Sequence, residues 1–305
     1  MKKIICLLVV IVVCIISLQA QDLFPAARLT TDPALEGFPT WSPDGNYIIY
    51  QFTEMNDTSN KNGLWRISQD GSGAVQIFQG IAEHPKWSPD GRHIVFDADT
   101  GKAIKMIPVE GGCPIVFLPD SIHIQNGGLP CWSPDASKIA FIEGGTLSLC
   151  IYDFHLDQVI RIFREEGVLP LPGGWTTDGQ WVLAALMDRQ SRKSTMWKIA
   201  SDGKKREQIS GHHENFYRHL ALSPDGSLLV YAAMEGRYLG LYIMPTNGGP
   251  TLPLAVIPSG HTEGASWSPD GKQIAFNRFV AGNADIWIMD VDTETIKKEL
   301  RALNE

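Results

Sequence analysis

The chain has 305 residues, of which 44% are apolar and 9% aromatic, and it carries 34 acidic against 26 basic side chains. A net charge of −8 disfavours nucleic-acid binding, because that affinity depends on lysine and arginine side chains that neutralise phosphates. After residue 20 no segment is long and apolar enough for a membrane-spanning helix, so the sequence predicts no membrane span in the mature chain.

The first twenty residues have the pattern of a secretory signal peptide. Two lysines at positions 2 and 3 precede an apolar run over residues 4–18, and Ala20 is a small residue suited to cleavage before Gln21. The apolar run is shorter than the ~20 residues of a membrane-spanning helix. The sequence therefore predicts cleavage near Ala20–Gln21 and a periplasmic, cell-surface or secreted location. The alternative is that residues 1–20 are retained as an anchor.

Residues 21–305 are predicted to form one domain, because a single unit recurs along them. The unit is centred on the pattern Trp-Ser-Pro-Asp-Gly, and successive copies are 43 to 47 residues apart. This is the period of a four-stranded propeller blade. The predicted fold is thus an all-β, six-bladed β-propeller of four-stranded antiparallel blades. The copies are anchored at Trp41, Trp87, Trp132, Trp175, Leu222 and Trp267.

Each copy predicts the same order of elements. A short inner strand ends at the Trp, Ser-Pro-Asp-Gly forms a turn, and two further strands and a more polar outer strand follow. The Trp residues are expected to pack between blades. The Asp residues are expected to shape their own turns and not to converge on a catalytic centre. Ala136 replaces the turn Gly in the third copy and is expected to be strained by ~1 kcal/mol.

The two ends of the repeat region compete to close the ring. The segment "AARLTTD" before Trp41 and the segment "ETIKKELRAL" near the C-terminus both resemble an outer strand. The N-terminal one is favoured, because it leads into the first inner strand as the other outer strands do. Three cysteines remain after residue 20, Cys113, Cys131 and Cys150, and they are interpreted mainly as buried small hydrophobes, with a Cys113–Cys131 disulfide as the alternative.

Six WSPDG-type repeats behind a signal peptide resemble the TolB-type, WD-repeat-like propellers of bacterial envelopes, over roughly residues 27–290. Propellers of this kind occur in the Tol–Pal system, as gates of prolyl-oligopeptidase-type enzymes and as oligogalacturonate lyases. A gated peptidase needs a nucleophile elbow, and no Gly-x-Ser-x-Gly occurs in the sequence. The resemblance implies a protein or peptide partner in the envelope, and membership of a Tol–Pal system stays open.

The candidate site lies in the loops that join one blade to the next, because such loops of a propeller ring one face. Several of these loops carry His and Glu, which suit a divalent metal or a general base. The alternative is that these loops are simply solvated. The other polar residues of these loops are Glu36, His123, Glu165, Glu166, His212 and His219. The residues selected as ligand-binding are Glu83, His84, His213, Glu214, His261 and Glu263.

The predicted function is a non-catalytic, monomeric module that binds an envelope protein or peptide, with no cofactor and no catalytic residues. The alternative is a metal-assisted polysaccharide lyase or hydrolase that uses His84, His213, Glu214 and His261 around the channel. A divalent metal is compatible with these loops but has no motif to support it, because HExxH and phosphate-loop patterns are absent.

Overall fold

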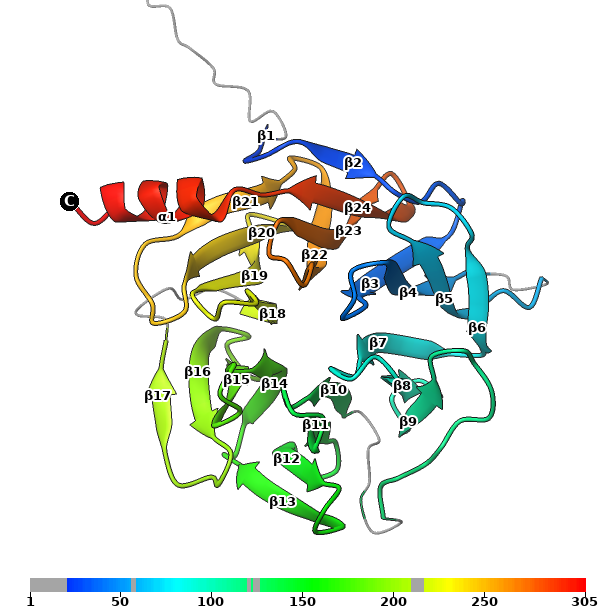
Figure 1. Cartoon of the computed structure of the whole chain (residues 1–305). Coiled ribbons are helices and arrows are strands. Elements are labelled where there is room, and N and C mark those ends of the chain that lie inside the picture. The colour runs from blue at the N-terminus through cyan, green and yellow to red at the C-terminus, as the bar shows by residue number, and fades with distance from the viewer. Residues whose placement is uncertain (1–20, 56–58, 120–121, 123–126, 210–216) are drawn as a thin grey trace, which may run out of the picture.

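Antiparallel sheets surround a central axis, with one strand of each set lying closest to that axis (Figure 1). The computed structural model describes residues 21–55, 59–119, 122, 127–209 and 217–305. The fold is an all-β propeller of four-stranded antiparallel blades, as the repeat predicts. No helix in these ranges is long and apolar enough to cross a membrane.

The strands follow the predicted order within each repeat. The innermost strands end at the Trp position of the repeat, and they are β3 (Leu35–Trp41), β7 (Ala82–Trp87), β10 (Gly128–Trp132), β14 (Val168–Trp175), β18 (Tyr217–Leu222) and β22 (Gly260–Trp267). The second strands are β4 (Tyr47–Thr53), β8 (His93–Ala98), β11 (Lys138–Glu143), β15 (Trp181–Asp188), β19 (Leu228–Glu235) and β23 (Gln273–Val280). The third strands are β5 (Gly63–Ser68), β9 (Ala103–Pro108), β12 (Ser148–Asp153), β16 (Ser194–Ala200), β20 (Tyr238–Pro245) and β24 (Asn283–Asp290).

The remaining elements lie at the outer rim of the ring. The outer strands are β6 (Val75–Gln79), β13 (Gln158–Phe163), β17 (Arg206–Gln208) and β21 (Leu252–Val256). Two short strands precede the first repeat, β1 (Gln21–Asp22) and β2 (Ala26–Arg28), and one helix follows the last, α1 (Thr293–Ala302).

The prediction of six separate four-stranded blades is wrong at the level of hydrogen-bonded sheets. The described strands form four sheets of four or more strands and one sheet of three. Two sets of strands merge into an eight-stranded sheet because β24 pairs with β3 in parallel at Ala284 and Leu35. The three-stranded sheet is β7–β8–β9, where the predicted outer strand is reduced to a single bridge between Met106 and Ile115. Pro114, which has no backbone N–H to donate, stands at the start of that segment.

The N-terminal strand joins the last repeat, as predicted. β2 pairs antiparallel with β24, and an ion pair of 2.5 Å between Arg28 and Asp285 supports this pairing. β1 pairs with β21, and Asp22 lies 2.5 Å from Arg278. The N-terminal segment therefore connects two sheets of the ring and covers the edge of β24.

The C-terminal segment is a helix, and its interpretation as a strand was wrong. Asp292 caps α1 by accepting from the backbone N–H groups of Glu294 and Thr295. Ile296 and Leu300, one turn apart, are buried in the same core cluster as the β20 and β23 side chains. An amphipathic helix with an Asp cap thus packs outside the ring without adding a strand.

The repeated turns have the structure that their sequence predicts. In every copy the Ser or Thr after the Trp position donates to the turn Asp over 2.5–2.7 Å, and its oxygen accepts from the backbone N–H five residues on. Each turn Asp therefore bonds within its own turn. Ala136 has a φ of 58°, the left-handed conformation that favours Gly, as expected.

The Trp residues pack between neighbouring sheets. Trp175 donates from Nε1 to the carbonyl oxygen of Cys131 in the preceding sheet, over 3.1 Å, and Trp267 donates in the same way to Ala221, over 3.2 Å. Among the described residues no disulfide forms, because Cys131 and Cys150 are buried free thiols and Cys113 is an exposed one. The exposure of Cys113 differs from the expected burial.

Candidate functional site

All the inner strands carry an irregularity at the same place, shortly before the Trp position. The pairing with the second strand shifts there by one or more residues, which is the signature of a β-bulge. The residue three positions before the Trp position has a positive φ of 50–67° in five of the six strands. The residues at this position are Phe38, His84, Leu129, Pro172, His219 and Gly264.

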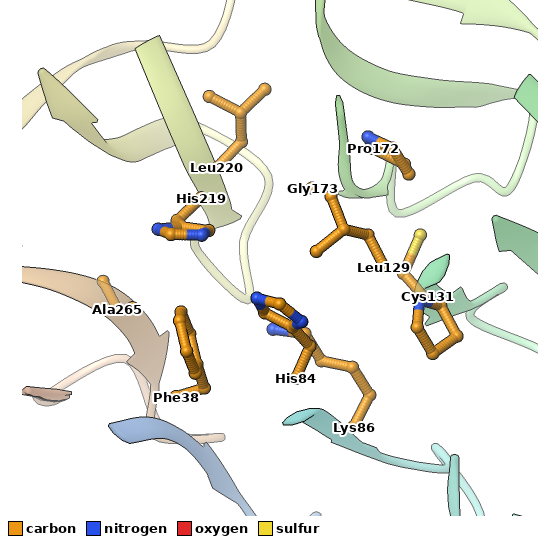
Figure 2. Close-up of a pocket in the computed structure, with 12 residues that line it drawn as sticks. Phe38, His84, Lys86, Leu129, Cys131, Pro172, Gly173, His219, Leu220 and Ala265 are labelled. Carbon is orange, nitrogen blue, oxygen red and sulfur yellow. The ribbon is translucent and has the colours of Figure 1, made fainter. Parts of the chain in front are cut away.

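These six residues line a narrow pocket on the axis, together with side chains from the same strands (Figure 2). The cavity has a volume of about 30 Å³. The Phe38 ring lies 4.2 Å from the His84 ring and 5.1 Å from the His219 ring, measured between centroids. Lys86 and Cys131 also contribute to the lining. We call this pocket the constriction.

A wider cavity of about 330 Å³ adjoins the constriction and shares His84, Leu129, Pro172 and His219 with it. We call it the mouth. The apolar part of its lining is formed by Ile142, Leu169, Leu171 and Met187, from β11, β14 and β15. The polar part includes Glu83 and Asp97, from β7 and β8, and Arg218, from β18. The mouth is therefore amphipathic, with both kinds of side chain lining one space.

Asp97 organises the polar part of the mouth. Its carboxylate lies 2.8 Å from Nδ1 of His84 and accepts from the backbone N–H of Leu129 over 3.1 Å. Leu129 belongs to the next inner strand, so this one carboxylate links two sheets. Gly128 is required beside it, because a Cβ there would lie 2.3 Å from Asp97 Oδ1. At the same position of another repeat, Asn277 accepts from the Phe38 N–H over 3.2 Å.

A second charged group lies where β18 meets β22. Glu263 forms an ion pair with Arg218 and lies 3.3 Å from Nδ1 of His219. Burial opposes the charge of this carboxylate, but the contacts with His219 and Arg218 prevail and lower the pKa of Glu263 to about 2. Burial lowers the pKa of His219 to about 4. At neutral pH, Glu263 is therefore ionised and paired with Arg218, and His219 is neutral.

The structure separates the residues that the sequence selected. Glu83 and His84 line the mouth, and Glu263 lies beside it in contact with Arg218 and His219. His261 is not part of either cavity; its Nδ1 accepts from the backbone N–H of Leu239, and its ring packs between Tyr238 and Phe279. His213 and Glu214 lie outside the described residues, as do His123 and His212.

Sequence reasoning missed most of the cavity lining. The predicted site residues are polar and are expected in loops, whereas Asp97 lies in a second strand and Phe38, Leu129 and Pro172 are apolar or aromatic. In the six copies the position three residues before the Trp holds Phe, His, Leu, Pro, His and Gly, and the two positions that follow it also vary. The sequence therefore contains no distinct signal for the position that lines the axis.

The arrangement offers hydrogen-bonding groups and an apolar surface. The His84–Asp97 pair has the geometry of a general base held by a carboxylate. Burial raises the pKa of the Cys131 thiol to about 12, so it is not activated as a nucleophile. Within the part of the chain that the structure describes, no group of three or more His, Cys, Asp or Glu side chains is placed to hold a metal ion.

Comparisons with known proteins agree with this fold. No protein-family model matches the chain. An uncharacterized protein of Agrobacterium fabrum is 25% identical over 269 residues, which cover 81% of this chain and 86% of that protein. The solved structure of a candidate TolB from Agrobacterium tumefaciens superposes with a TM-score of 0.63 at 22% identity, covering 86% of this chain and 93% of that one.

An oligogalacturonate lyase from Vibrio parahaemolyticus superposes with a TM-score of 0.61 at 14% identity, covering 90% of this chain and 96% of the lyase. The chain is therefore a TolB-like β-propeller in its fold, as its repeats indicate. The same fold carries enzymes, so the fold alone does not define the function.

Proposed function

We propose that the protein is a non-catalytic module that binds a protein or peptide of the bacterial envelope at the mouth of its axial channel. The observation that carries this proposal is the amphipathic mouth of about 330 Å³. Its apolar part can take an apolar side chain of the partner, and its polar part can bond the partner's backbone. Ligand sites of proteins commonly combine these two kinds of surface.

The charges around the mouth also favour binding over catalysis. Asp97 is engaged through Oδ2 by His84 and by the Leu129 N–H, and Glu263 is engaged by Arg218, while Asp97 Oδ1 is buried without a hydrogen-bond partner among the described residues. These contacts fix the shape of the polar part of the mouth. Binding of an uncharged peptide segment is consistent with this arrangement.

The test uses Leu169, in the apolar part of the mouth, and Leu156, which is 61% exposed in the turn between β12 and β13. Partner capture from an envelope extract should be lost in Leu169→Glu and retained in Leu156→Glu, while both variants unfold cooperatively. Equal capture by the two variants would place the binding surface elsewhere and would refute the proposal.

A second candidate function is that of an enzyme acting on glycans. The observation in its favour is the His84–Asp97 pair, which faces the mouth and could serve as a general base. A solved oligogalacturonate lyase of similar fold is described in complex with manganese. The mouth also contains Glu83 and His219, but among the described residues no three His, Cys, Asp or Glu side chains are placed to hold one metal ion, which fits a manganese site poorly. Glycan cleavage that is abolished in His84→Ala would establish this alternative.

We also propose that the protein is exported, cleaved near Ala20–Gln21 and monomeric, and that residues 21–305 fold as one domain. For the repeat count, we infer that the eight-stranded sheet contains two repeat units joined at Ala284 and Leu35, which gives six units in the chain. Mass spectrometry and light scattering of the secreted protein test the first three statements. An intact Met1 or a stable dimer would contradict them.

A further inference from the structure

Lys86 is the basic side chain of the constriction. It lies on β7, two residues after His84, and Figure 2 shows it extending from its strand into the pocket. Around it are the Cys131 thiol, the Leu129 side chain and the two histidine rings. Desolvation in this setting lowers the pKa of the Lys86 ammonium.

The charge of Lys86 has no counterion among the described residues. Besides burial, the titratable neighbour that affects the pKa of Lys86 is the Cys131 thiol. The nearby acids are committed elsewhere, Asp97 to His84 and Glu263 to Arg218. Burial keeps the Cys131 thiol protonated by raising its pKa to about 12, so it supplies no negative charge at neutral pH.

The Lys86 side chain is partly buried. An ammonium without a counterion in such a site is destabilised, and a small anion beside it would offset that cost. The constriction has the size for such a group. Its volume of about 30 Å³ exceeds the ~10–15 Å³ that one water requires, which leaves space for the two oxygens of a carboxylate but not for a side chain. Larger groups must stay in the adjoining mouth.

We propose that the constriction binds the C-terminal carboxylate of a peptide, with Lys86 as the partner of that carboxylate. This inference rests on the proposed function and names its ligand class. The last side chain of the peptide then lies against Leu171 and Met187 in the mouth, because the mouth continues from the constriction through Leu129 and Pro172. An apolar C-terminal residue fits that surface.

The proposal predicts a dependence on the chemical form of the peptide end. A carboxylate held by an ammonium away from water forms a charge-assisted hydrogen bond, whereas a terminal amide in the same place leaves the ammonium unpaired. The difference corresponds to roughly tenfold or more in affinity. A Lys86→Met variant should lose this difference, and it should fold at least as stably as the parent because an unpaired charge is removed.

The experiment is calorimetric titration of the secreted protein with the peptide Ac-Gly-Ser-Gly-Leu, as the free acid and as the C-terminal amide. We expect the acid to bind at least about tenfold more tightly than the amide, with this preference lost in Lys86→Met and kept in Lys298→Met, an exposed lysine of α1. Equal affinity for acid and amide overturns the carboxylate site. If Leu169→Glu weakens the binding of both peptides in that case, the proposed function still stands. If neither peptide binds, the carboxylate site is refuted, and the partner-capture experiment remains the test of the proposed function.

A second measurement is independent of peptide binding. Lysines labelled with ¹³C-methyl groups report their own ionisation by NMR, and Lys86→Met assigns the signal of Lys86. Acetate should raise the pKa of Lys86, because the anion stabilises the ammonium form, and should leave the signal of Lys298 unchanged. Absence of that response overturns the anion site. A response to acetate combined with no preference for the peptide acid overturns the peptide terminus as its ligand.

Discussion

The acids of the repeated turns and the acids near the axis follow different rules. Every turn has an Asp that accepts from the Ser or Thr two residues before it, so the same contact occurs once per copy. Glu36, Asp97 and Glu263 lie in inner or second strands, are buried or partly buried, and each has different partners. An acid that recurs in every copy therefore indicates a role in the fold of the repeat. A buried acid that occurs in one copy indicates a role specific to its own site.

Among the acids that occur in one copy, substitution of Glu36 is expected to change the free energy of unfolding most. Burial raises its pKa to about 8, against the opposing hydrogen bond from Thr30, and the nearby Asp32 and Asp285 add to the rise while Arg28 reduces it. A folded pKa above the unfolded value means that stability is complete below the unfolded pKa and falls as pH rises towards 8.

Glu36→Gln should remove this decline and stabilise the protein by about 2–4 kcal/mol at pH 8.5, with a small effect at pH 4. Denaturant unfolding at both pH values measures it. The exposed Glu299→Gln in α1 is the matched control. An identical pH profile in Glu36→Gln and the parent would show that Glu36 is not a buried, protonated acid.

Asp97 is expected to have the next largest effect. Asp97→Ala leaves the His84 Nδ1 and the Leu129 N–H without their acceptor, which should lower the free energy of unfolding by about 2 kcal/mol. Asp97→Asn keeps one carbonyl oxygen and should lose less. Unfolding curves compare the two variants. If alanine and asparagine are equally destabilising, the hydrogen bonds are not the source of the effect.

The repeated turns should show the smallest effect and no effect on binding. Ser268→Ala removes an oxygen that accepts from the Gln273 N–H and a hydroxyl that donates to Asp270, at a cost of about 1 kcal/mol. Ser42→Ala removes the equivalent contacts of another turn and should cost the same. Titration with the peptide acid should give the parent affinity for both variants. A change in affinity would show that the turn residues also affect binding, against the contrast between the turns and the axis.

The sequence predicts what is repeated much better than what occurs once. The turns, the inner strands and the β2 closure follow from patterns that six copies reinforce. The prediction of an outer strand at the site of α1 is wrong, although Asp292 and the spacing of Ile296 and Leu300 are helix signals. The partnership of Asp97 with His84 could not be read at all, because a bulge in β7 decides which side chains meet.

The closing strand also fixes when the ring can form. Arg28 and Asp285 are 257 positions apart in the chain, and β2 has no partner until β24 has emerged. Contacts of such long sequence separation form late, because a long loop must close before they contribute. If the chain is exported as proposed, β2 leaves the translocation pore first and stays unpaired until nearly all of the polypeptide has crossed. Completion of export would then coincide with completion of the ring.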